Sequence, residues 1–353
     1  MKTRKATMKK DNPFTLTFGK QPIEYISRYE STDRVISTFT AEHPVSQAYL
    51  IEGIRGSGKT VLMTTIANEL KEKNDWVVVD LNATQDLVED LCMRLADSCK
   101  KAPELVEAGI NISFAGYGVG FNGSTQPRDD ISTIEEFLRV LHKKQKRVLI
   151  TIDEVMQGHN MRYFASQFQI WVRKDYPIFL LMTGLYENIY AIQNDPALTF
   201  LLRTPKIHLE PLSIYQIAKQ YRSIFQIGAE EARELADITK GYAFAFQALG
   251  MLYYEYRETE DLKDILEKLD DMLDDFVYKK IWETLSAQDR QIVQVMPEGE
   301  IKVGELCGKL SMTSAVFSKY RERLLKKGII CATKHGYVAL ALPRFSGIVQ
   351  NYG

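Results

Sequence analysis

The octet GIRGSGKT at residues 53–60 constrains the fold of this chain more than any other stretch. It matches the pattern G-x-x-x-x-G-K-[ST], and it stands between the apolar run QAYLIE (47–52) and the helical pattern VLMTTIANELKEK (61–73). A strand that turns through a glycine-rich loop into a helix directs backbone N–H groups and the positive end of the helix dipole at one point. The octet therefore predicts a strand–loop–helix unit that holds phosphate groups.

The residue types within the octet predict how the phosphates are held. The glycines let the backbone come close to the β- and γ-phosphates, and Lys59 adds a point charge on their oxygens. The Thr60 hydroxyl is a predicted ligand of Mg²⁺. The predicted nucleotide-binding residues of this stretch are Gly53, Gly56, Ser57, Gly58, Lys59, Thr60 and Val61.

A second stretch, RVLITIDEV (147–155), supplies two adjacent carboxylates after an apolar run. Because ligands of parallel sheets bind at the carboxyl ends of the strands, Asp153 is predicted to reach this edge and hold Mg²⁺. Glu154 is predicted to orient and deprotonate an attacking water. This pair favours hydrolysis by water over transfer to a small acceptor, although Glu154 could also be an exposed acid at a strand end.

Strand and helix patterns alternate from residue 46 to residue 211, which predicts an α/β fold with a parallel sheet covered by helices on both faces. The stretch 109–123 alternates strictly and predicts a β-hairpin inserted into this pattern. After Pro211 the strand patterns stop and helical patterns follow. The predicted segments are an N-terminal tail and approach segment (1–45), a nucleotide-binding core (46–211), a helical lid (212–280) and a C-terminal domain (281–353).

Taken together, the chain resembles the AAA+ ATPases of the additional-strand, catalytic-glutamate class of P-loop NTPases. The resemblance rests on GIRGSGKT, LITIDEV, the strand YPIFLLMTG (176–184) and the junction LLRTPKIHLEPLS, and it covers about residues 13–345. It is closest to the clade of archaeal-type ATPases, origin-recognition initiators and STAND signalling ATPases. It implies a parallel five-stranded sheet, a helical lid and a winged-helix domain, with ATP and Mg²⁺ as cofactors and ADP as product.

The resemblance also implies roles for individual residues. Thr183, at the tip of the fourth strand, is expected to sense the γ-phosphate, although it could be a strand-capping hydroxyl. Arg203 stands where the family has an arginine finger, in cis or in trans, although it could be a surface arginine. Tyr25 and Ile26 are expected to flank the adenine. The stretch GYAFAFQ (241–247) has neither the arginine nor the proline of the usual lid sensor.

Residues 286–341 follow the pattern of a helix-turn-helix with a two-stranded wing. Residues 301–345 carry nine Lys and Arg against two Glu, so nine minus two gives +7. Residues 251–300 carry six Lys and Arg against fourteen Asp and Glu, so six minus fourteen gives −8. This basic end predicts phosphate contacts on double-stranded DNA. The predicted DNA-facing residues are Ser314, Ser318, Lys319, Arg321, Arg323 and Lys334.

Three functions are compatible with these patterns. The first is an ATP-hydrolysing, DNA-associated protein whose role is loading, remodelling or regulation on DNA. The second is a STAND-like signalling switch that oligomerises with ATP and uses its winged helix for protein contacts, with the basic charge docked on the acidic lid. The third is a remodelling partner of a nuclease or transposase. We also expect a homo-oligomer or a protein partner in the ATP state.

Cysteine usage and hydropathy bear on the compartment. The four cysteines form no C-x-x-C pair and His is scarce, which argues against a disulfide framework or a zinc site. No apolar run approaches the ~20 residues needed to span a bilayer. The sequence therefore predicts a cytoplasmic protein without a membrane partner.

Overall fold

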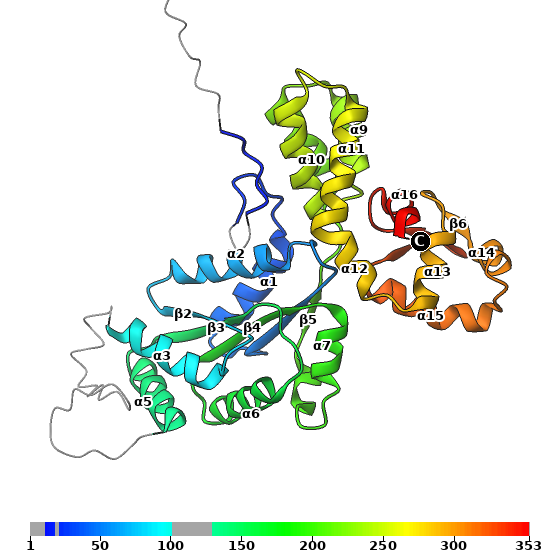
Figure 1. Cartoon of the computed structure of the whole chain (residues 1–353). Helices are drawn as coiled ribbons and strands as arrows, with labels where there is room; N and C mark the ends of the chain where they lie inside the picture. The colour runs from blue at the N-terminus through cyan, green and yellow to red at the C-terminus, as the bar shows by residue number, and fades with distance from the viewer. Residues whose placement is uncertain (1–10, 18–20, 101–128, 353) are drawn as a thin grey trace, which may run out of the picture. The chain divides into compact units, whose positions relative to one another are not determined.

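The computed structural model describes residues 11–17, 21–98 and 129–352 in full, and residues 99 and 100 as part of a helix (Figure 1). Contacts group the chain into two compact units. The sheet unit comprises residues 28–53 and 59–209, and the helical unit comprises residues 1–27, 54–58 and 210–353. The hairpin predicted at 109–123 lies outside the described residues.

A parallel five-stranded sheet organises the sheet unit. Its order is β2-β3-β4-β1-β5. The strands are β1 (Ala48–Glu52), β2 (Trp76–Leu81), β3 (Arg147–Ile152), β4 (Ile178–Gly184) and β5 (Lys206–His208). Strand β4 lies between β1 and β3, which is the additional strand that gives the predicted class its name. The predicted α/β fold with five parallel strands is therefore confirmed.

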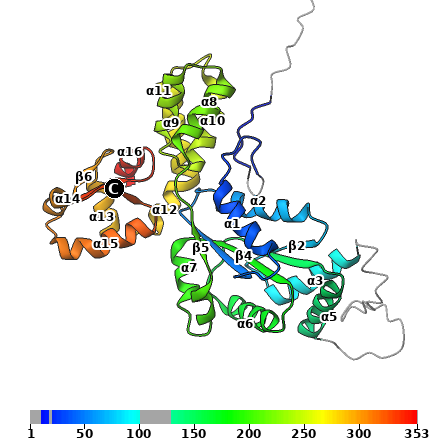
Figure 2. The ribbon, with the colours of Figure 1, turned by 180° about the vertical axis from the view of Figure 1, so that it is seen from behind.

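Helices cover both faces of this sheet, because its strands bury apolar side chains on both sides. One core joins α1 (Tyr29–Thr40) and α2 (Lys59–Lys71) to Tyr49 and Ile51 of β1. The other core joins Ala48 and Leu50 to the remaining helices. These are α3 (Leu87–Lys100), α5 (Asp130–Lys143), α6 (His159–Arg173) and α7 (Tyr186–Gln193). Figure 2 shows the same two layers from behind.

The boundaries of α2 and β5 have local physical reasons. Helix α2 begins at Lys59, so Lys59 and Thr60 lie in its first turn. The apolar pattern KIHLEPL (206–212) predicts a strand as far as Leu212, but β5 ends at His208. Beyond it, Pro211 has no N–H to donate to a neighbouring strand. The Leu212 N–H instead donates to the Gly241 carbonyl at 2.8 Å.

The first part of the helical unit is a set of packed helices. They are α8 (Ile214–Phe225), α9 (Ala229–Ile238), α10 (Ala243–Tyr256) and α11 (Leu262–Leu273). Helix α11 continues without a break through the π-helical turn η2 (Asp274–Tyr278) into α12 (Lys279–Glu283). Phe14 of the approach segment inserts into this core and packs against Tyr221, Phe225 and Phe246. A Cβ on Gly250 would lie 2.5 Å from the Phe14 ring, so the segment lies tightly against α10.

The C-terminal module, residues 287–352, combines helices with a small antiparallel sheet. Its elements are α13 (Ala287–Val295), β6 (Ile301–Lys302), α14 (Val303–Lys309), α15 (Ser314–Lys326), β7 (Ile330–Lys334), β8 (Tyr337–Leu340), α16 (Phe345–Val349) and η3 (Gln350–Tyr352). The sheet order is β6-β8-β7, so a third strand joins the predicted pair. The stretch KHGY (334–337) forms the turn between β7 and β8, with Gly336 at φ +77°.

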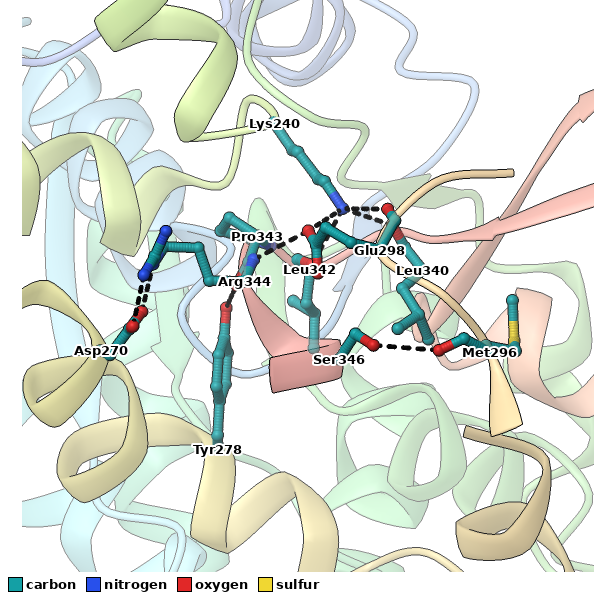
Figure 3. A network of polar contacts seen from close by, with 10 residues as sticks. All are labelled: Lys240, Asp270, Tyr278, Met296, Glu298, Leu340, Leu342, Pro343, Arg344 and Ser346. Carbon is teal, nitrogen blue, oxygen red and sulfur yellow. Dashed lines mark hydrogen bonds and ion pairs between the residues drawn. The ribbon is translucent and has the colours of Figure 1, made fainter. Parts of the chain in front are cut away.

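Polar contacts and a shared core join the C-terminal module to the preceding helices (Figure 3). The Lys240 ammonium lies 2.7 Å from a Glu298 carboxylate oxygen. Arg344 pairs with Asp270 of α11 through two nitrogens. The Tyr278 hydroxyl donates to the Pro343 carbonyl at 2.7 Å. The helices and the module are therefore one compact body.

Candidate active site

The candidate site lies at the carboxyl edge of the sheet. Gly53 follows β1, Asp153 follows β3, and Thr183 is the penultimate residue of β4 between them. Because the three strands are parallel and adjacent, their ends meet at this edge. The sheet thus gathers residues that are 130 positions apart, as Gly53 and Thr183 are.

Asp153 is the centre of a hydrogen-bonded group. The Thr60 hydroxyl donates to Asp153 Oδ2 at 2.8 Å, and the Thr183 hydroxyl donates to Asp153 Oδ1. Thr183 is fully buried, so its hydroxyl depends on this partner. The structure therefore brings together three of the predicted site residues.

This group fits a magnesium ion. The Thr60 hydroxyl and the Asp153 carboxylate are hard oxygen donors within hydrogen-bonding distance of each other. Among the described residues, no cluster of three or more His, Cys, Asp or Glu side chains could hold a metal. A site with few protein ligands suits Mg²⁺, which keeps several waters and binds the phosphates of its nucleotide.

The backbone of the loop turns at two glycines. Gly56 and Gly58 have φ of +74° and +92°, in the left-handed region that favours glycine. The Ser57 N–H donates to the Ile54 carbonyl at 3.2 Å and closes the turn. At the start of α2, the buried Lys59 ammonium donates to the Gly53 carbonyl at 3.0 Å. The ammonium is thus held at the first residue of the octet.

Glu154 occupies an uncommon backbone conformation beside this group. Its φ is +51°, which costs about 1 kcal/mol for a residue with a Cβ. Its N–H donates to Asp153 Oδ1 at 3.0 Å and to the Thr183 hydroxyl at 3.3 Å, which holds the turn in place. The residue is exposed, so its carboxylate is accessible to water.

Arg203 lies away from this edge. It ends the 3-10 helix η1 (Thr199–Arg203), just before the start of β5, whereas the loop follows the end of β1. Strands β1 and β5 are parallel, so the two positions belong to opposite edges of the sheet. The residue is exposed.

The two residues predicted to flank the adenine belong to the helical unit. Ile26 packs against the helical core, and Tyr25 is half-buried. The Gln247 side chain donates to the carbonyl of the neighbouring Glu24. Contact between Tyr25 or Ile26 and an adenine stays a prediction.

The structure divides the predicted DNA-facing residues into two sets. Ser314, Ser318 and Lys319 are exposed on α15. Arg323 is instead paired at 2.6 Å with Asp289, which is 1% exposed, and Lys334 is paired with Glu300. Arg321 is half-buried. The basic end therefore offers fewer available charges than the count of +7 indicates.

Two contacts at the loop were missed by sequence reasoning. The Tyr242 hydroxyl donates to the Arg55 carbonyl at 2.6 Å, and the Phe244 N–H donates to the Gly56 carbonyl at 3.1 Å. Both residues belong to GYAFAFQ (241–247), the stretch that lacks the arginine and proline of the usual lid sensor. An aromatic residue directly after Gly241, which has φ +74°, was the available signal.

Comparisons with solved structures show where this fold occurs. A Walker-type ATPase of Pyrococcus abyssi aligns with a TM-score of 0.63 at 12% identity, over 92% of this chain and 96% of that one. The ORC2 protein of Aeropyrum pernix, in ADPNP–ADP complexes, aligns with a TM-score of 0.60 at 14% identity, over 95% and 96%. Cdc6p of Pyrobaculum aerophilum aligns with a TM-score of 0.51 at 14% identity, over 95% and 96%.

These likenesses establish the fold as that of P-loop AAA+ ATPases of the Orc/Cdc6 type. A family model for a domain of unknown function (DUF8462) matches residues 275–348, which include most of the C-terminal module. No curated protein sequence matches the chain. Among the described residues, no helix combines the length and apolar character needed to cross a bilayer.

Proposed function

We propose that this chain, which has the fold of Walker-type and Orc/Cdc6 ATPases, binds ATP with Mg²⁺ and hydrolyses it to ADP and phosphate. The observation that carries the proposal is the group formed by Thr60, Asp153 and Thr183 at the carboxyl edge of the sheet. The decisive experiment is ATP binding and turnover by the purified chain and by its Glu154 and Lys59 variants.

Each residue has one task in this reaction. Lys59 and the loop N–H groups bind the β- and γ-phosphates, and Thr60 and Asp153 would hold Mg²⁺. Mg²⁺, when bound, neutralises charge on the phosphate oxygens. Glu154 takes a proton from a water whose oxygen forms a bond to the γ-phosphorus, while the bond to the β–γ bridging oxygen breaks. Thr183 orients Asp153 through its hydroxyl.

We further propose that the C-terminal module, as a winged helix, binds double-stranded DNA through the exposed start of α15. Lys319 is exposed there and forms no ion pair with the described residues, in contrast to Arg323 and Lys334. Lysine neutralises a DNA phosphate and releases counterions, so binding should weaken steeply with salt.

The Lys319→Ala change tests this surface. We expect weaker binding to duplex DNA, with the slope of log affinity against log salt reduced by about 0.9, the value for one phosphate contact. Fluorescence anisotropy at several salt concentrations, with ATP and with ADP, measures it. Lys219→Ala, at another exposed lysine, on α8, is the control and should leave the slope unchanged. Undetectable binding at low salt in both nucleotide states would contradict DNA association.

A second candidate function is an ATP-dependent switch that self-associates. The observation that favours it is the place of Arg203 at the edge of the sheet opposite the loop. An arginine there is unsuited to its own cradle but can serve the cradle of a second copy. This would be an arginine finger in trans, which stabilises transition-state charge.

Self-association predicts turnover that depends on protein concentration. Turnover per chain should rise several-fold as the protein concentration passes the dissociation constant of self-association, and light scattering should show a larger mass with ATP. Arg203→Ala should abolish the rise, because the neighbouring site loses its cation. Arg173→Ala, an exposed arginine at the end of α6, should retain it. A monomer in every nucleotide state would rule this switch out.

A further inference from the structure

Residues 241–244 hold the tip of the phosphate loop by its main chain. Two consecutive loop carbonyls, of Arg55 and Gly56, accept hydrogen bonds from the Tyr242 hydroxyl and the Phe244 N–H. The fit is close, since a Cβ on Gly56 would lie 2.2 Å from the Tyr242 hydroxyl. Residues 54–58 and this stretch belong to the same compact unit.

These bonds bear on how the loop can receive phosphate. In a trans peptide the carbonyl and the following N–H point in opposite directions. Fixing the Arg55 carbonyl toward Tyr242 therefore directs the Gly56 N–H to the other side, and N–H groups are what a phosphate cradle presents. Burial raises the pKa of Tyr242 well above its usual value, although Arg55 opposes the shift, so the hydroxyl remains a donor at all working pH values.

The same stretch is linked to the C-terminal module. The ring of Tyr242 stacks on that of Tyr278, with centroids 6.4 Å apart and planes at 27°. The Tyr278 hydroxyl donates to the Pro343 carbonyl, and the next residue, Arg344, pairs with Asp270 (Figure 3). A Cβ on Gly328, just after α15, would lie 3.5 Å from Ile54 of the loop. The loop tip thus adjoins both the lid helices and the module.

We infer that Tyr242 is a positioning residue for the phosphate loop, and that through Tyr278 it links the state of the loop to the C-terminal module. The inference rests on the proposed nucleotide site. In this chain the hydrogen bonds of residues 242 and 244 to the loop carbonyls would couple the helices to the nucleotide. A lid arginine would make this coupling by contacting the γ-phosphate directly. A change in the loop conformation would shift Tyr242, and with it the Tyr278 ring. The hydrogen bond from Tyr278 to Pro343 would pass this shift on to the module.

Tyr242→Phe removes only the hydroxyl and keeps the ring against Tyr278. We expect a loss of ATP affinity of about fivefold, since one neutral hydrogen bond contributes on this scale. Tyr278→Phe removes the bond to Pro343 but leaves the loop contact, so ATP affinity should stay near the wild-type value. Tyr215→Phe, at an exposed tyrosine on α8, is the matched control and should change nothing.

Amide hydrogen exchange separates the two steps. Without nucleotide, Tyr242→Phe should speed exchange across residues 53–60, whereas Tyr278→Phe and Tyr215→Phe should not. In the wild type, ATP should slow exchange across residues 337–349, and both Tyr242→Phe and Tyr278→Phe should lose this response although ATP still binds at saturation. A purely structural role would not remove an ATP-dependent response in a folded protein, and thermal melts establish the folding.

The outcomes distinguish the inference from the proposed function. If Tyr242→Phe matches Tyr215→Phe at residues 53–60 without nucleotide, Tyr242 does not position the loop. If the ATP response at 337–349 persists in Tyr278→Phe, the link to the module is wrong. If the wild type binds no ATP, the proposed function and the coupling both fail, while exchange without nucleotide still decides the role of Tyr242 at the loop.

Discussion

Glu154→Gln is expected to lower ATP turnover by about 10²–10⁴-fold while ATP and Mg²⁺ still bind, because an amide cannot accept the proton of the attacking water. The side chain keeps its size, and the hydrogen bonds that hold this turn come from the backbone N–H of residue 154. The uncommon φ of +51° is therefore retained. Phosphate release under saturating ATP measures turnover, and titration with a fluorescent ATP analogue measures binding.

The control for this variant is Glu69→Gln, which makes the same chemical change at an exposed position on α2. It should hydrolyse ATP at the wild-type rate. Turnover by Glu154→Gln at the wild-type rate would show that another group accepts the proton. Loss of both binding and turnover would instead mean that Glu154 contributes to the fold of the site rather than to the chemical step.

Lys59→Ala is expected to reduce ATP affinity by at least about 100-fold. Hydrogen bonds to charged groups contribute about 1.5–3 kcal/mol each, and Lys59 can donate to both the β- and γ-phosphates. The ammonium donates to the Gly53 carbonyl at 3.0 Å, at the first residue of the octet. Isothermal titration gives the affinity.

A thermal melt provides an independent reading of the Lys59 variant, since a ligand that binds only the folded state raises its stability. Wild-type protein should melt at a higher temperature with ATP than without it, and Lys59→Ala should not. Lys71→Ala, at the exposed end of the same helix, should respond as the wild type does. Unchanged ATP affinity in Lys59→Ala would place the nucleotide elsewhere.

The sheet and its carboxyl edge could be predicted because their signals are local. The apolar runs give the strands, and Asp153 follows one run directly, so parallel pairing alone brings it to the loop. The contact of Tyr242 with Arg55 joins residues 187 positions apart in sequence and could not be read from local spacing. The acceptor is also a main-chain carbonyl, which every residue type has, so the identity of residue 55 does not indicate the contact.

The net charge of the C-terminal module also depends on contacts that the sequence does not show. The total of +7 was correct as a sum, but a sum does not tell which cations are already paired. Arg323 finds Asp289 in α13, and Lys334 finds Glu300 just before β6. These partners lie in the acidic stretch 251–300, so part of the predicted charge contrast is neutralised within the fold. Arg344 with Asp270 follows the same rule.

The π-helical turn η2 sets the phase of the long helix that runs from α11 into α12. A residue advances an α-helix by about 100°, and a π turn accommodates one residue more than an α turn. The surplus residue therefore decides which side chain of Asp274–Tyr278 faces inward: Tyr278 is fully buried, while Phe276 is 51% exposed. In an otherwise regular helix, one residue fewer would rotate Tyr278 away from Tyr242. The number of residues in this turn therefore sets the direction in which the following side chains point. A single insertion or deletion here would turn all of them around the helix axis, whereas most substitutions would change one side chain.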